Sequence, residues 1–130
     1  MIDRLEKTRM QQARESLDEA KALLEGDMDA GFVMNGLYYA FYYPVIALVY
    51  QGQVPSAMQS VVIGQFDKQF ISTGTFPREF SEAIHRVFDL KPSCGGEKVT
   101  VPQDEAVRLA KVAQDFIAAV NLYLQFKAAP

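Results

Sequence analysis

The sequence lacks a second cysteine, since Cys94 stands alone among 130 residues. The chain can therefore form no intramolecular disulfide, which excludes a disulfide-stabilised secreted domain and a zinc site made of four thiolates from one chain. Cys94 lies in a Pro-Ser-Cys-Gly-Gly segment. A nucleophilic cysteine needs a base and a group that orients it, so we interpret Cys94 as an ordinary loop thiol.

The sequence also lacks a second histidine. Glu82 and His85 have the spacing that supplies half of a carboxylate-bridged di-iron site in helical bundles, but such a site needs two of these pairs. Because Glu82, His85 and Asp89 share one helical face, we predict a surface histidine, with no metal site and no cofactor.

An excess of positive charge is missing too. The 13 Lys and Arg residues are outnumbered by 16 Asp and Glu, for a net charge of -3. A net negative charge does not attract phosphate backbones, so a primary nucleic-acid binder is disfavoured. An acidic chain can still carry a local basic patch. The charged N-terminal segment has no apolar leader, and we expect a cytoplasmic protein.

A long uninterrupted apolar run is absent as well. No Asp, Glu, Lys or Arg lies between Asp29 and Asp67, but the densest apolar stretch extends only from Leu37 to Tyr50 and contains Pro44. A bilayer span needs about 20 mostly apolar residues. We therefore predict a buried helix and no contact with a membrane.

Hydrophobic periodicity predicts helices over about 3–25, 29–51, 57–71, 77–90 and 102–126, with no convincing strand. Gly26 is available for a left-handed cap, Ser56 for an N-cap, and Pro77 for the first turn of a helix. Pro44 predicts a kink. Short connections favour an all-α, antiparallel up-and-down bundle of about five helices, forming a single domain over residues 1–130.

The predicted helix over 29–51 has no polar face. A five-helix monomer can cover only part of such a helix, and a large exposed apolar patch usually marks an interface. We therefore predict a homodimer.

Four tyrosines within that helix are the most distinctive local feature. Tyr38 and Tyr42 are one turn apart, and so are Tyr39 and Tyr43, so the two pairs lie on adjacent faces. They can pack in the core and at an interface with their hydroxyls at the surface. Alternatively, they form a stacking platform for a base or a nucleotide.

The order of several motifs resembles the HEPN superfamily. The motifs are Tyr38-Tyr39-Ala40-x-Tyr42, Phe66-x-x-x-Phe70-Ile71, Gly74-x-Phe76-Pro77, Val87-Phe88-x-Leu90-Lys91, and the closing pattern from Ala113 to Leu124. The resemblance covers nearly the whole chain. It is strongest to the small bacterial and archaeal proteins that pair with minimal nucleotidyltransferases, and it implies a helical bundle.

The departures from the family pattern concern its polar residues. Asn35-Gly36-Leu37 stands where such proteins commonly have an arginine, Gln59 where they often have a histidine, and the segment from Lys91 to Gly96 where an arginine and an aspartate-tyrosine pair are usual. The arginine-to-histidine motif of the nuclease members is not found. Cleavage of that type needs a base and a cation, so we predict that the chain is not an enzyme of this kind and has no catalytic residue.

The resemblance implies a non-catalytic module, dimeric, that serves a separate nucleotidyltransferase as partner or substrate-binding subunit in a toxin-antitoxin-like system. The alternatives are an RNA-binding or degenerate toxin-like protein and, third, an RNase that uses other residues. The ligand expected is a nucleotide or RNA. The candidate ligand-binding or interface residues are Tyr38, Tyr39, Tyr42, Tyr43, Gln59 and Lys91.

Overall fold

The computed structural model describes residues 2–26, 29–92 and 100–128. Within these ranges the chain is helical and contains no strand, which confirms the predicted all-α class. The elements are α1 (Arg4–Glu25), α2 (Ala30–Val49), α3 (Gln59–Phe66), the π-helical turn η1 (Asp67–Ile71), α4 (Arg78–Leu90) and α5 (Gln103–Ala128).

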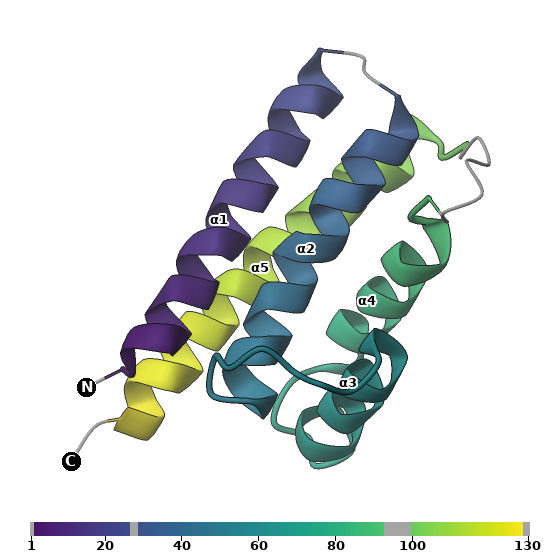
Figure 1. Cartoon of the computed structure of the whole chain (residues 1–130). Coiled ribbons are helices and arrows are strands. Elements are labelled where there is room, and N and C mark those ends of the chain that lie inside the picture. Colours follow the sequence, from purple (N-terminus) through teal and green to yellow (C-terminus); the bar gives the residue numbers. More distant parts are fainter. Residues whose placement is uncertain (1, 27–28, 93–99, 129–130) are drawn as a thin grey trace.

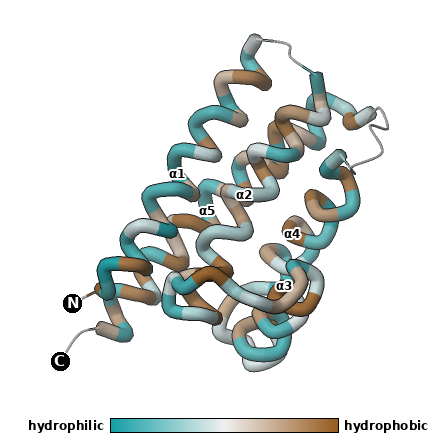
Figure 2. Tube along the Cα trace, viewed as in Figure 1, coloured by the Kyte–Doolittle hydropathy of each residue, from teal (hydrophilic) through white to brown (hydrophobic). Residues whose placement is uncertain are grey.

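The four longer helices run in alternating directions, and α3 with η1 forms a short arm between α2 and α4 (Figure 1). The helix α2 lies at the centre and contacts α1, α3, α4 and α5. The first residues of α1 and the last residues of α5 lie at the same end of the bundle (Figure 1). Hydrophobic and hydrophilic residues alternate in short runs along α1 and α4 (Figure 2), as expected for helices with one face toward a core.

The boundaries of α1 are those expected from the sequence, but its C-terminal cap is not. The Asp3 carboxylate accepts a hydrogen bond from the Leu5 N–H at 2.8 Å, and Glu6 Oε1 accepts one from the Asp3 N–H at 3.1 Å. The Asp3 side chain also accepts from the Glu6 N–H, and the two reciprocal bonds between Asp3 and Glu6 form a capping box that fixes the start of the helix. At the other end Gly26 has φ -83°, so the predicted left-handed cap is wrong. The Gly26 N–H instead continues the helical pattern to the Ala22 carbonyl.

The segment before α3 also differs from the prediction. Ser56 does not cap the helix, which begins at Gln59 after Met58 in an extended conformation. The chain is held instead by α1, where Arg9 Nε donates to the Gly52 carbonyl at 2.8 Å. Gly52 has φ +88°, and a Cβ there would lie 2.5 Å from the Leu5 carbonyl carbon, so only glycine fits. This contact holds the chain at Gly52, in the segment between α2 and α3.

The helix α2 continues through Pro44, which is buried. By length and composition it could cross a membrane, but 67% of its most apolar window is buried inside the bundle, and the core helix of a bundle meets the same criteria. Four neighbouring elements contact α2 and cover most of it, but not all, as the sequence predicts. Phe32, at 63% exposure, is its exposed large apolar side chain. The homodimer stays a prediction.

Candidate functional site

Three of the six candidate residues meet where α2, α3 and α4 come together. The Tyr38 hydroxyl donates a hydrogen bond to Gln59 Oε1 at 2.8 Å. Lys91 Nζ lies 5.1 Å from the centroid of the Tyr38 ring and 5.3 Å from that of Phe88. We call Tyr38, Gln59, Phe88 and Lys91 the tyrosine–lysine cluster.

The ends of two helices position the polar members of the cluster. Gln59 is the first residue of α3, and Lys91 directly follows α4. The Lys91 N–H donates to the Val87 carbonyl at 2.9 Å, while its ψ of 147° turns the chain away from the helix axis. A cation at a helix C-terminus is stabilised by the helix dipole. The ammonium over two rings adds a cation–π attraction.

The four tyrosines divide into a buried pair and a half-buried pair. Tyr38 and Tyr42 are stacked at 5.4 Å and are 1% and 6% exposed, so their ring faces are occupied by packing. Tyr39 and Tyr43, on the neighbouring stripe of α2, are half-buried with their ring centroids 5.5 Å apart. Only this second pair retains ring surface that a ligand or a partner can contact.

Burial raises the pKa of two of the tyrosines, Tyr38 and Tyr42. Burial raises the pKa of Tyr38 well above its usual value, and Tyr42 and Tyr39 raise it further. Tyr38 therefore stays neutral, and its hydroxyl donates a hydrogen bond to Gln59. Burial likewise raises the pKa of Tyr42, with smaller contributions from Tyr50 and Tyr39.

The cluster therefore offers one positive charge. Among the described residues, Lys91 has no carboxylate within ion-pair distance. Because Gln59 accepts through Oε1, its amide N–H groups remain oriented donors. An ammonium and an amide of this kind can bind an anionic oxygen, with aromatic rings behind them.

Phe88 was not among the candidate residues, although it comes three residues before Lys91. Its ring lies 5.7 Å from that of Tyr38 and completes the surface on which the ammonium rests. Helical spacing alone places residues three apart on one face, so this spacing was the available signal.

His85 lies on the surface, as expected, but it has a partner that the sequence did not indicate. Its Nε2 is 2.6 Å from Asp67 Oδ2, and the Ser81 hydroxyl donates to Asp67 Oδ1 at 2.7 Å. Both side chains contact the same carboxylate rather than each other, so the serine is not activated by the histidine. Across the described ranges, no three His, Cys, Asp or Glu side chains gather at metal-binding distance.

The predictions for Cys94 and for Ser93 to Gly96 concern residues outside the described ranges. That Cys94 is an ordinary loop thiol stays a prediction. So does the replacement of the family's arginine and aspartate-tyrosine pair by this segment.

The chain is similar over most of its length to a protein whose printed name gives only its family. It is 30% identical over 114 residues to a protein of Thermotoga maritima named "UPF0332 protein", and the match covers 87% of this chain and 86% of the relative. No protein-family model matches the chain, and neither does any solved structure.

Proposed function

The chain belongs to the UPF0332 family, and on this premise we propose that it is a HEPN-like helical module that binds a nucleotide or RNA phosphate without cleaving it. Binding uses the tyrosine–lysine cluster. The module acts as a dimeric partner or substrate-binding subunit of a separately encoded nucleotidyltransferase, as the resemblance to small HEPN proteins implies.

One observation carries the ligand proposal. Lys91 presents an ammonium without a carboxylate neighbour in the described part of the chain, 5.1 Å from the centroid of the Tyr38 ring, whose hydroxyl is bonded to the Gln59 amide. A surface lysine without a function would more often pair with a carboxylate or extend into solvent. Here the side chain is half-buried over two rings, so it is held in place before any ligand arrives.

The same cluster lacks the groups for cleavage. Metal-independent RNA cleavage needs a base that accepts the proton of the attacking hydroxyl. Gln59 does not titrate, and the raised pKa of Tyr38 keeps its phenol protonated. The ionisable side chain left in the cluster is Lys91, which supplies charge but no base while protonated.

A binding assay with a fluorescent ATP analogue and a short single-stranded RNA tests the proposal. We expect Lys91→Ala to weaken binding by about tenfold or more, because charge-assisted contacts contribute about 1.5–3 kcal/mol. Lys111→Ala is the matched control, since Lys111 lies on α5 and is paired with Asp115 at 2.9 Å. It should leave the affinity unchanged.

The same RNA, incubated with the wild type and with Lys91→Ala, tests the absence of catalysis. We expect the RNA to stay intact in both samples. Cleavage by the wild type that is lost in Lys91→Ala would contradict the non-catalytic reading. Equal affinity of the wild type and Lys91→Ala would instead contradict the binding site.

A further inference from the structure

One side of α2 is open to solvent and carries aromatic rings. The helices α1 and α4 lie on either side of α2, and α5 lies behind it (Figure 1). Spacings of seven and four residues place Phe32, Tyr39 and Tyr43 along one stripe of the helix. Phe32 is 63% exposed and the two tyrosines are half-buried, so this stripe faces the open side. We call these three residues the aromatic stripe.

The aromatic stripe lies in a part of the chain without charged side chains. No Asp, Glu, Lys or Arg occurs between Asp29 and Asp67, a range that includes all of α2 and α3. An uncharged row of rings can pack on a second protein or on the flat faces of other aromatic groups. The cations at its edges distinguish these two uses.

Lys91 lies at one edge of the aromatic stripe. The ring of Tyr38 separates the two, because its centroid is 5.1 Å from the Lys91 ammonium and 5.3 Å from the centroid of the Tyr39 ring. A Cβ on Gly31 would come within 3.1 Å of Pro92, so the residue after Lys91 lies beside the first turn of α2. The ammonium therefore flanks the first half of the stripe.

A second cation, Arg9 of α1, lies where the aromatic stripe ends. Its Nε donates to the Gly52 carbonyl at 2.8 Å, and its Nη1 donates to Gln12 Oε1 at 2.7 Å. The Gly52 N–H in turn donates to the carbonyl of Ile46, which follows Tyr43 by three residues on α2. These bonds hold the guanidinium in place. Among the described residues its Nη2 has no hydrogen-bond partner and the side chain forms no ion pair.

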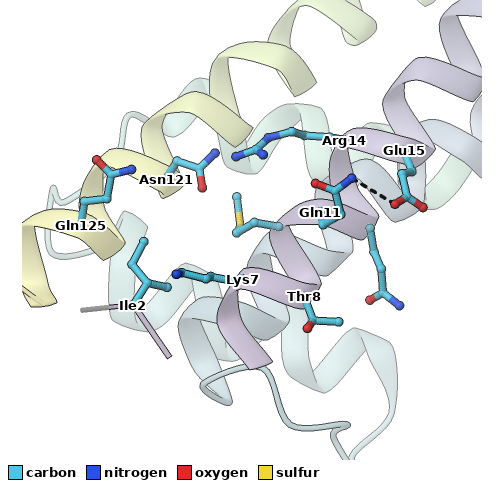
Figure 3. Close-up of a pocket in the computed structure, with 10 residues that line it drawn as sticks. Ile2, Lys7, Thr8, Gln11, Arg14, Glu15, Asn121 and Gln125 are labelled. Carbon is cyan, nitrogen blue, oxygen red and sulfur yellow. Dashed lines mark hydrogen bonds between the residues drawn. The ribbon is translucent and has the colours of Figure 1, made fainter. Parts of the chain in front are cut away.

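A hollow elsewhere on α1 offers cations in a different setting. It has a volume of about 700 Å³ and lies between α1 and α5, where Arg14 is directed toward Asn121 (Figure 3). Glu15 lines the same hollow, and its described lining contains no aromatic ring. A carboxylate repels an anion, and without a ring there is no surface on which a base can stack. Arg14 therefore serves below as the control for Arg9.

Rings flanked by unpaired cations match a single-stranded nucleic acid. The ring centroids of Tyr39 and Tyr43 are 5.5 Å apart, which is wider than the step of about 3.4 Å between successive nucleotides of a strand in a duplex. Two bases that stack on these rings are therefore unstacked from each other, as a single strand allows. In a duplex both faces of each base are covered, and a free nucleotide has only one base to stack.

A second copy of the chain fits the aromatic stripe less well. A two-fold contact through the stripe would bring Lys91 and Arg9 against the same cations of the other copy. The stripe supplies no carboxylate to pair with them. Burying unpaired cations is costly, whereas the phosphates of a strand neutralise them. In that case the predicted homodimer uses another surface.

We propose that the aromatic stripe binds a single-stranded oligonucleotide, with successive bases on Tyr39 and Tyr43 and with phosphates at Lys91 and Arg9. This inference rests on the proposed function and narrows its ligand to a strand rather than a free nucleotide. The contacts involve bases and phosphates but not the 2′ hydroxyl, so RNA and single-stranded DNA bind alike. Stacking contributes more to the affinity than charge does, which agrees with a net charge of -3.

Fluorescence anisotropy with labelled strands of about six nucleotides tests the stacking. We expect RNA and DNA of the same sequence to bind within about threefold of each other, and a duplex or an abasic strand with the same phosphates to bind at least about tenfold more weakly. Tyr39→Leu and Tyr43→Leu should each weaken binding of the normal strands by about fivefold or more and leave the abasic strand unchanged. Phe126→Leu is the matched control, because its 82% exposed ring lies on α5.

The salt dependence of binding counts the phosphate contacts. Each contact with a single strand contributes about 0.7 to the steepness with which log affinity falls against log salt concentration, so the wild type should give about 1.4. Lys91→Ala and Arg9→Ala should each lower the value to about 0.7, whereas Arg14→Ala should leave it unchanged. The slope is the readout for Arg9, which also holds Gly52, because a smaller folded fraction lowers the apparent affinity equally at every salt concentration.

Two outcomes separate this inference from the function on which it rests. Weaker binding by Lys91→Ala, with wild-type affinity in both tyrosine variants, would overturn the aromatic stripe and leave the proposed phosphate site intact. Weaker binding by the tyrosine variants, with full affinity in Lys91→Ala, would contradict the proposed phosphate site instead. Equal binding of the abasic and normal strands would also overturn the inference. So would a homodimer, seen by light scattering, that Tyr39→Leu and Tyr43→Leu dissociate.

Discussion

The two sides of α2 are packed in opposite ways. Toward α1 the contact is made by small residues, and a Cβ on Gly36 would lie only 3.1 Å from the Ala20 Cβ. Away from α1 the space is filled by rings. Phe116 of α5 has its centroid 5.7 Å from Phe41, 5.6 Å from Phe66 and 5.1 Å from Phe80.

This difference predicts opposite sensitivities to mutation. A side formed by close backbones has no room for added atoms, whereas a side filled by rings leaves a cavity when one is removed. The ring side also ends in direct polar contacts, such as that of Tyr38 with Gln59.

The largest effect is expected from truncation on the ring side. Phe116 is 0% exposed, so Phe116→Ala should lower the free energy of unfolding by about 3–5 kcal/mol, because it removes buried ring surface and leaves a cavity. Denaturation in urea measures the change. The matched control is Phe126→Ala on the same helix, where an 82% exposed ring should contribute less than about 0.5 kcal/mol. Similar losses in the two variants would contradict the comparison.

On the α1 side, enlarging a side chain should lower the stability of the fold. Gly36→Leu forces α1 and α2 apart at Ala20 and should cost about 1–3 kcal/mol. Gly64→Ala is the matched test on α3, where an added Cβ meets no atom within 4 Å. It should stabilise the protein by up to about 1 kcal/mol, because alanine favours the helix more than glycine does. Thermal denaturation of the two variants should shift in opposite directions.

The sequence predicted the helices well, because their periodicity is local. It failed where a distant contact decides the conformation. Gly52 is held by Arg9, 43 positions away, and no signal near Ser56 indicated that its cap would not form. The apolar character of α2 was evident from the sequence, but the four elements that cover most of it were not, because their contacts join segments far apart in the chain.

The candidate site was predicted as a set of residues rather than as a geometry. The resemblance indicated Gln59 and Lys91 as departures from a pattern, and the tyrosines were conspicuous by their spacing. The contact of Tyr38 with both residues depends on how α3 and α4 pack on α2. Asp67 was missed as the partner of His85, since 18 residues and a turn of the chain separate them.

A moderate effect is expected where the ring side meets the polar cluster. Tyr38→Phe keeps the buried ring and removes only the hydroxyl that donates to Gln59. We expect a loss of about 0.5–1.5 kcal/mol, the net contribution of one hydrogen bond. In the Tyr38→Phe background, Gln59→Ala should lower the free energy of unfolding only by the packing that the Gln59 side chain contributes. A double-mutant cycle by urea denaturation measures the coupling, and strictly additive losses would show that the two side chains do not interact.

The smallest effect concerns the outer edge of the ring side, where α4 meets α5. Arg86 donates to both oxygens of Glu105, at 2.8 and 3.0 Å, and this pairing lowers the pKa of Glu105. A lowered carboxyl pKa stabilises the fold above the ordinary glutamate pKa of about 4.3. The stabilisation is lost as pH falls through the lowered value. Because the pair is exposed to solvent, Arg86→Ala should cost at most about 1 kcal/mol at neutral pH.

The difference in stability between the wild type and Arg86→Ala should therefore shrink as the pH is lowered past that range. Urea denaturation at neutral and at acidic pH measures it, and titration of Glu105 by NMR should show its pKa rising in the variant. Arg108→Ala is the control, because Arg108 reaches the same carboxylate only at 3.8 Å and should change both quantities less. A difference that stays the same at acidic pH would mean that Arg86 stabilises the edge by packing its methylene groups rather than by pairing. The outer edge of the ring side would then be stabilised by packing, as its interior is.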